Sequence, residues 1–237
     1  MTRYSFKVKG TERKIIAQLI GAATNQAATY VGPPSFAYEI GSIAIDRAGT
    51  ISAPLDEHFE SVLTGLRENG IEAEGALAIT IPQKDHTGVS LRNLVNIISS
   101  KEKLLNKALG RSRQIIPPEI VEAVNAIRLE EADDFAQAIK DMSTGAISFD
   151  FNLKTITFSF YIASLEADTI KAYAALSTAL DQQAKQHKYT SFLQKEVDNE
   201  KYAFRCFLLR LGFIGEEYKS NRKVLLSKLE GNGAYAK

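Results

Sequence analysis

Alternation of polar and apolar residues predicts strands in the N-terminal third of the chain. The pattern has period two and is bounded by Gly and Pro, which is typical of half-buried strands. The strands are expected at residues 4–9, 35–40, 42–46 and 76–82. Between them, a period near 3.6 predicts a helix from Thr11, a candidate N-cap, and a helix over 56–69 capped by Asp56. The order up to Pro82 is therefore β-α-β-β-α-β.

Each of these helices has an apolar stripe that predicts its buried face. The stripe of the first helix is Ile15, Ile16, Leu19, Ile20 and Ala23. The stripe of the second is Phe59, Val62, Leu63 and Leu66.

A similar pattern starts again after Pro82. A helix over 90–109 carries the stripe Leu91, Leu94, Val95, Ile98, Leu105 and Leu109. Pro117-Pro118 interrupt the chain, and a short helix over 131–142 is expected to bury Phe135 and Ile139. Two alternating strands then flank 152–154, and their inward faces are Ile147, Phe149 and Phe151, and Ile156, Phe158, Phe160 and Ile162. A long helix over 166–187 follows.

These elements predict an α+β fold. The order β-α-β-β-α occurs twice, over about 1–75 and about 76–187, with an insertion near 116–145 in the second copy. Strands with one apolar face and helices with one apolar stripe favour an antiparallel-rich sheet with helices on one face. We therefore expect a pseudo-duplicated body over 1–187, on which a basic C-terminal helical hairpin over 188–237 packs.

The C-terminal segment predicts two helices joined by a short turn with Gly212 and Gly215. Asp198 can cap the first helix, which runs to residue 211 and is apolar nearly all round, so it is expected in the core. The second helix runs over 216–229 and is expected to bury Tyr218, Leu225 and Leu229.

The charge of the chain is uneven. Its net charge is +1, so no global field favours nucleic acid or acidic lipid. From Lys188 onward, however, ten Lys and Arg face six Asp and Glu. A basic C-terminal tail on a mildly acidic body favours a polyanionic partner.

Two basic clusters are candidate nucleic-acid-binding sites. The last helix follows a short Gly turn, as in a helix-turn-helix, and carries Lys219, Asn221, Arg222 and Lys223. The second cluster could complete a strip that tracks phosphates, and it contains Lys101, Lys103, Lys107, Arg111 and Arg113. The alternative is that both clusters are solvated faces of amphipathic helices, since no run of aromatic residues is interleaved with them to stack bases.

Motifs for catalysis and metal binding are weak. Cys206 is the single cysteine, and His58, His86 and His187 have no second His or Cys at ligand spacing. Asp85-His86 is interpreted as a surface turn. The chain has no Gly-rich phosphate loop and no G-x-S-x-G motif. An enzyme is therefore disfavoured, and no catalytic residue, metal or cofactor is assigned.

Targeting signals are also missing from the sequence. The N-terminus has no apolar signal core, and no apolar run approaches the roughly 18 residues that span a bilayer. With a single cysteine, this predicts a cytoplasmic protein without a membrane partner. The oligomeric state stays open.

Four stretches resemble a family of small bacterial proteins known as "virulence-related protein". They are YSFKVKGTERK, SFAYEIGSIAIDRAGT, LRNLVNIISSKEKLLNKALG and, most similar, NEKYAFRCFLLRLGFIGEEYKSNRKVLLSKLEGN. The family occurs in Gram-positive gut anaerobes, often within mobile elements. The resemblance implies a bacterial cytoplasmic setting and a role in element maintenance or host interaction. It implies no site residue.

Three function hypotheses follow from the sequence. The first is a non-enzymatic mobile-element accessory protein that binds nucleic acid through the basic C-terminal helix. The second is a protein-interaction or inhibitor module, on which a host protein docks at an exposed sheet face or edge. The third is an enzyme with a site between the two halves.

Overall fold

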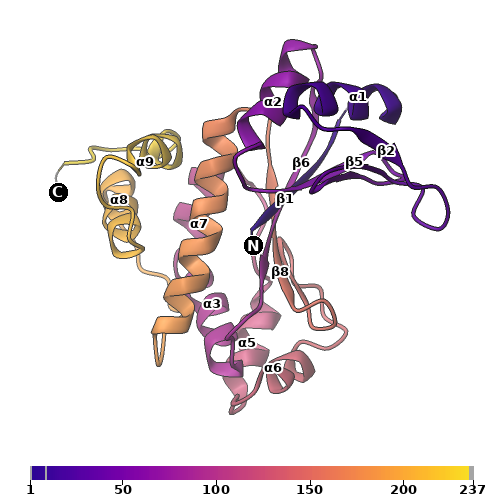
Figure 1. Cartoon of the computed structure of the whole chain (residues 1–237). Coiled ribbons are helices and arrows are strands. Elements are labelled where there is room, and N and C mark those ends of the chain that lie inside the picture. The colour runs from indigo at the N-terminus through magenta and orange to yellow at the C-terminus, as the bar shows by residue number, and fades with distance from the viewer. Residues whose placement is uncertain (1, 9, 235–237) are drawn as a thin grey trace. The chain divides into compact units, whose positions relative to one another are not determined.

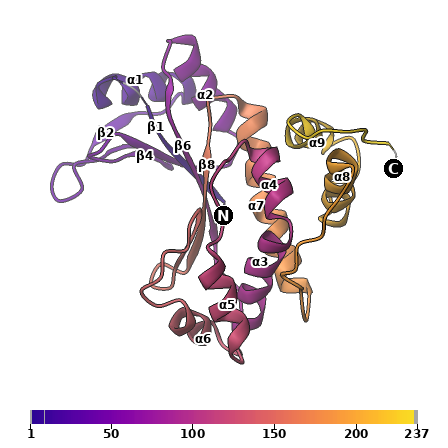
Figure 2. The same cartoon turned by 180° about the vertical axis from the view of Figure 1, so that it is seen from behind.

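The chain forms an α+β fold in which runs of strands and runs of helices follow one another (Figures 1 and 2). The computed structural model describes residues 2–8 and 10–234. The strands are β1 (Arg3–Val8), β2 (Ala28–Tyr30), β3 (Tyr38–Ile40), β4 (Ile43–Ile45), β5 (Thr50–Pro54), β6 (Ala73–Pro82), β7 (Ile147–Asp150) and β8 (Thr155–Tyr161). The helices are α1 (Arg13–Thr24), α2 (Phe59–Glu68), α3 (Gly88–Ser100), α4 (Glu102–Leu109), α5 (Pro118–Ala126), α6 (Ala132–Ala138), α7 (Ala167–Gln186), α8 (Glu200–Arg210) and α9 (Lys219–Leu226). Lys9, the predicted end of the first strand, lies outside the described residues.

The described strands form one open, antiparallel sheet with the order β2-β3-β4-β5-β1-β6-β8-β7. β1 lies between β5 and β6 and is antiparallel to both, with Arg3 opposite Pro54 on one side and Thr80 on the other. The expected turn at Gly41-Ser42 joins β3 to β4. The prediction of an α+β fold with an antiparallel sheet is therefore confirmed.

The chain divides into two compact units. The first comprises Met1–Ile81 and Ser159–Ala174, and the second comprises Pro82–Phe158 and Ala175–Lys237. Residues of β8 and α7 therefore belong to both units. The boundary predicted near residue 75 separates the two copies of the repeat, and the one predicted at residue 187 separates the body from the C-terminal hairpin. Both stay predictions.

The core of the first unit lies between the sheet and two helices. α1 and α2 cover the same face of its strands (Figure 1). The Tyr4 ring of β1 meets the Phe59 ring of α2 edge-on, with centroids 5.1 Å apart. All four residues of the predicted α2 stripe are buried.

The predicted buried face of α1 is wrong at Ile15, which is 45% exposed. The helix instead buries a face that includes Ala17 and Gly21. A Cβ on Gly21 would lie 2.7 Å from the Gln26 carbonyl oxygen. The missing side chain therefore lets the following backbone pack against α1, which turns Ile15 outward.

The core of the second unit is built around α3. This helix packs against α4, α5 and α6, and the six apolar residues predicted for the 90–109 stripe are all buried. α9 contacts both α4 and α8. α8 was expected to be buried all round, but Leu209 and Arg210 are exposed, so only one side of it belongs to the core.

The predicted helix over 90–109 is in fact two helices that meet at Lys101. This residue has φ −120° and ψ 10°, outside the helical region. Just before it, the Ser100 hydroxyl donates to the Ile97 carbonyl oxygen at 2.9 Å. A serine hydroxyl that bonds the backbone in this way competes with continuation of the helix. The break places Lys101 at a junction instead of on a regular helix face.

Three elements were not predicted, namely β2, β5 and α5. β2 and β5 are only three and five residues long, so neither gives a clear alternating pattern. α5 starts at Pro118, at the first helical position, where proline is well tolerated. Pro117-Pro118 was interpreted as an interruption, but it is a helix start.

Several helix ends also differ from the predictions. The N-cap of α1 is Glu12, one residue after Thr11. Asn199 caps α8 in place of Asp198, since its side chain accepts from the Tyr202 N–H at 3.1 Å. α2 starts at Phe59, after a turn that contains Asp56, and α9 is shorter than 216–229 at both ends.

The helices in the described part of the chain are too short or too polar for any of them to cross a membrane.

Candidate anion-binding pocket

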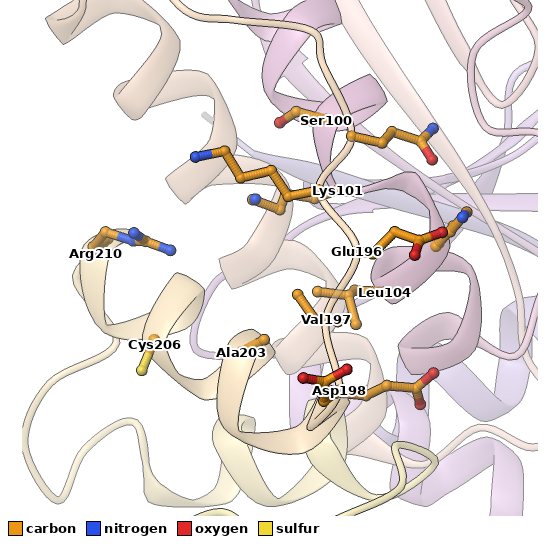
Figure 3. A pocket seen from close by; sticks show the side chains of 13 residues that line it. Ser100, Lys101, Leu104, Glu196, Val197, Asp198, Ala203, Cys206 and Arg210 are labelled. Atoms are coloured by element: carbon orange, nitrogen blue, oxygen red, sulfur yellow. The ribbon is translucent and has the colours of Figure 1, made fainter. Parts of the chain in front are cut away.

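A cavity of about 600 Å³ lies in the second unit (Figure 3). Its walls come from the α3–α4 junction, from the coil over 194–198 and from α8. These three segments are distant in the sequence, and each contributes charged side chains. The volume is in the range of small-ligand sites.

Four cations line this pocket, namely Lys101, Lys103, Lys195 and Arg210, and they come from three different segments. Lys101 and Arg210 extend toward the same side in Figure 3. Partial burial lowers the pKa of Lys101, and the positive charges of Arg210 and Lys195 lower it further. Lys101 therefore lies close enough to Arg210 and Lys195 for the three positive charges to repel one another.

Three carboxylates also line the pocket: Glu196, Asp198 and Glu200. Glu200 is paired with Lys107, whose Nζ lies 2.5 Å from its Oε1, and this bond raises the pKa of Lys107. Asp198 lies away from Lys101 and Arg210 in Figure 3. The pocket thus has a cationic side that suits a phosphate and an acidic side that suits a hydrogen-bond donor or a cation.

The predicted residues near α4 lie at or beside this pocket. Lys101 and Lys103 line it. Lys107 lies one turn further along α4 and is held by Glu200 of α8. This bond joins α4 to the start of α8, so Lys107 shapes the wall of the pocket.

The predicted residues of α9 lie apart from the pocket, whose described lining includes none of them. Lys219 Nζ is 3.0 Å from Glu216 Oε2. Arg222 donates to the carbonyl oxygens of Phe213 and Gly215, both at 2.9 Å, and so fixes the turn before α9. Asn221 is half-buried and Lys223 is exposed.

Two of the cations that line the pocket were not among the predicted site residues, namely Lys195 and Arg210. Arg210 lies at the end of a helix that the sequence predicts to be apolar nearly all round, so the pattern gave no hint of a partner across a pocket. Lys195 lies in coil, where no periodicity indicates which way a side chain points. Only the tertiary structure brings both to Lys101.

A second polar cluster in the second unit is buried. His86 was interpreted as part of a surface turn, but its side chain is 0% exposed. Its Nε2 lies 2.6 Å from Asp181 Oδ1, and its Nδ1 lies 2.8 Å from Ser90 Oγ. Asp181 is also paired with Lys185. This correction shows that His86 links the start of α3 to α7.

The order Ser90–His86–Asp181 resembles a nucleophile with its base and orienting carboxylate. The Ser90 hydroxyl, however, accepts from the Thr87 N–H at 2.8 Å and donates to the Thr87 carbonyl oxygen at 3.0 Å. It is buried within the capping box of α3. The cluster therefore serves as a helix cap and a cross-link.

In the part of the chain that the structure describes, no three His, Cys, Asp or Glu side chains are grouped so that they could hold a metal ion. Comparison with protein-family models, with curated proteins and with solved structures found no match. The resemblance to the virulence-related family stays a prediction.

Proposed function

We propose that this chain is a non-enzymatic protein that binds nucleic acid, with phosphate groups held at the cationic side of the pocket. The observation that carries the proposal is the convergence of Lys101, Lys195 and Arg210 from three segments of the chain. Lysine and arginine are the residues that contact phosphates in nucleic-acid complexes, and arginine can do so with two hydrogen bonds.

The electrostatics of Lys101 support the proposal. Its pKa is lowered by burial and then by its two cationic neighbours. A phosphate between these side chains would offset that repulsion, so binding favours the charged form of Lys101. The carboxylates of Glu196 and Asp198 oppose this attraction, so they are expected to reduce the net affinity for phosphate.

The cations of α9 are a second part of the proposal. α9 contacts α4, and its cations Lys219 and Lys223 are exposed, so they are available for further phosphates. Arg222 is less suited, since its guanidinium group is already bonded to two backbone carbonyls. We therefore expect the α9 cations to add to affinity and the pocket to dominate it.

The internal duplication, the C-terminal hairpin and the mobile-element role that were predicted from the sequence belong to the same proposal. The order β6-α3-β7-β8-α7 can be a second copy of β1-α1-β3-β4-α2, with α5 and α6 in the insertion. β2 and β5 then belong to the first copy alone. α8 and α9 contact each other and would form the C-terminal hairpin. A role as a mobile-element accessory rests on the family resemblance alone.

Binding of a fluorescent single-stranded oligonucleotide across a salt series tests the proposal. For about three phosphate contacts, the logarithm of the association constant is expected to fall with the logarithm of salt with a slope of about −2. Arg210→Gln should weaken binding about tenfold at low salt and make the slope shallower by about 0.7.

Lys219→Gln is the matched control, because it removes one charge from α9 and leaves the pocket intact. It is expected to weaken binding less than Arg210→Gln does. A larger effect of Lys219→Gln would place the main phosphate contacts on α9. Absence of binding by the wild type at low salt would show that the chain is not a nucleic-acid-binding protein.

The alternative, a protein-interaction module, has one observation in its favour. All three residues of the edge strand β2 are exposed, and Tyr30 is 50% exposed. An exposed edge can accept a strand from a partner protein, but a strand this short offers few backbone hydrogen bonds. The enzyme hypothesis gains nothing from Ser90–His86–Asp181, whose hydroxyl is buried.

A further inference from the structure

A second cavity of about 310 Å³ lies beside the first. The two share Ser100, Lys101 and Arg210, so the same two cations line both. The second cavity is otherwise lined by the end of α7, by the coil over 189–191 and by the buried side chains of Ile97 and Phe207. A group held by Lys101 and Arg210 is therefore next to a surface that is largely uncharged.

Tyr189 is the exposed aromatic residue of this cavity. The residue is 64% exposed, although burial of a tyrosine ring is favourable. The sequence indicated no aromatic residues interleaved with the basic cluster, because Tyr189 is far from Lys101 along the chain. The fold brings them to one cavity.

Buried amides hold the backbone on both sides of Tyr189. Asn93 donates to the His187 carbonyl oxygen at 2.6 Å, and Asn96 donates to the Thr190 carbonyl oxygen at 2.9 Å. Both asparagines are 0% exposed. A fixed backbone reduces the entropy that is lost when a ligand packs on the ring.

Building on the proposed function, we infer that the ligand is single-stranded nucleic acid, with one unstacked base against Tyr189 and a neighbouring phosphate at Lys101 and Arg210. A base inside a duplex has both faces covered by its neighbours, so it cannot pack on a protein ring. A single strand exposes these faces, and a cationic groove beside an aromatic residue is the usual arrangement for binding it. Stacking is tolerant of sequence, so little base preference is expected.

Three labelled probes of equal length test the inference: a single-stranded oligonucleotide, the same backbone without bases, and the duplex. The wild type should bind the single strand about tenfold more tightly than the abasic strand, because one base stacks. Tyr189→Ala should remove this difference and leave binding of the abasic strand unchanged. Tyr189→Phe should retain it, since the ring remains.

A second readout uses the absence of tryptophan from the chain. Tyr189→Trp introduces a single tryptophan, whose fluorescence should be quenched by the single strand and not by the abasic strand. Unchanged unfolding curves for the Tyr189 variants would show that the fold is retained.

The outcomes separate this inference from the proposed function. If the wild type binds neither the single strand nor the abasic strand, nucleic-acid binding itself fails. If all three probes bind alike and Tyr189→Ala has no effect, the proposed phosphate contacts are retained. The inference that a base stacks on Tyr189 is then wrong. Tighter binding of the duplex than of the single strand would also overturn the inference.

Discussion

The two units of the chain bury different kinds of side chain. Among the described residues, the polar side chain buried in the first unit is Thr24, whose hydroxyl donates to the Ile20 carbonyl oxygen of its own helix. The second unit buries six polar side chains: Gln83, Ser90, Asn93, Asn96, Ser177 and Asp181. Apart from the buried Tyr4 hydroxyl, the first core is therefore nearly apolar, whereas the second buries several polar side chains.

The kind of side chain that a core buries affects how precisely the core fixes the residues on the surface of the same unit. Apolar packing is non-directional and tolerates small shifts, whereas a buried hydrogen bond fixes a partner at a set distance. In the second unit these bonds end on the backbone of the coil after α7, at His187 and Thr190. We infer that the polar core sets the position of the proposed binding surface and that the apolar core provides stability alone.

The largest expected effect is loss of an apolar side chain from the first unit. Phe59→Ala removes a buried ring that contacts Tyr4, and it should lower the free energy of unfolding by about 3–5 kcal/mol. Urea unfolding measures this loss. Oligonucleotide affinity of the folded variant should match that of the wild type.

Phe59→Leu keeps more of the apolar volume and provides a folded variant if Phe59→Ala is too unstable to study. A drop in affinity for either folded variant would show that the first unit does more than stabilise the protein. The comparison between the two cores would then fail.

A smaller loss is expected from the polar core. Asn96→Ala leaves the Thr190 carbonyl oxygen and the Asn125 side chain without their bonds to Asn96, at a cost of about 1–3 kcal/mol. It should also weaken binding of the single strand, because the backbone beside Tyr189 is released. Urea unfolding and oligonucleotide titration measure the two effects.

Val95→Ala is the control for this variant, since Val95 is the buried apolar neighbour on the same helix. It should lower the free energy of unfolding and leave affinity for the single strand unchanged. Equal loss of affinity in both variants would mean that general destabilisation, and not the Asn96 bond, controls the binding surface.

The contrast between the cores also explains what the sequence could predict. Apolar periodicity reports which face of a helix is buried, so the stripes of α2, α3 and α4 were predicted correctly. The same rule assigns Asn93 and Asn96 to the outside of α3, although both are fully buried. Their backbone partners His187 and Thr190 lie 94 residues away, and periodicity carries no information on them.

Periodicity is equally uninformative about which residues form the candidate pocket. Lys101 and Lys103 stand out as a basic cluster, but the periodicity does not indicate the helix break at Lys101. Lys195 and Tyr189 lie in coil, which has no periodic signal. The basic C-terminal tail contains Lys195 and Arg210, and only the fold shows that they meet Lys101.

The smallest expected effect is the pH dependence caused by Lys101. Its pKa lies below the ordinary 10.5 in the folded chain, chiefly because of burial. Between the lowered value and 10.5 the unfolded chain binds more protons than the folded one, so the free energy of unfolding rises with pH in this window. Affinity for a phosphate ligand should change in the opposite direction, because deprotonation of Lys101 removes a positive charge.

Unfolding and binding measured across this window should therefore show opposite trends in the wild type. Lys101→Gln should remove the contribution of Lys101 to the pH dependence of both the free energy of unfolding and the affinity. Lys103→Gln leaves Lys101 in place and should keep both pH dependences. If Lys101→Gln keeps the wild-type dependence of affinity on pH, Lys101 does not contact the phosphate. In that case the partly buried charge of Lys101 would have no role in ligand binding. The two units would then differ only in how their cores contribute to stability.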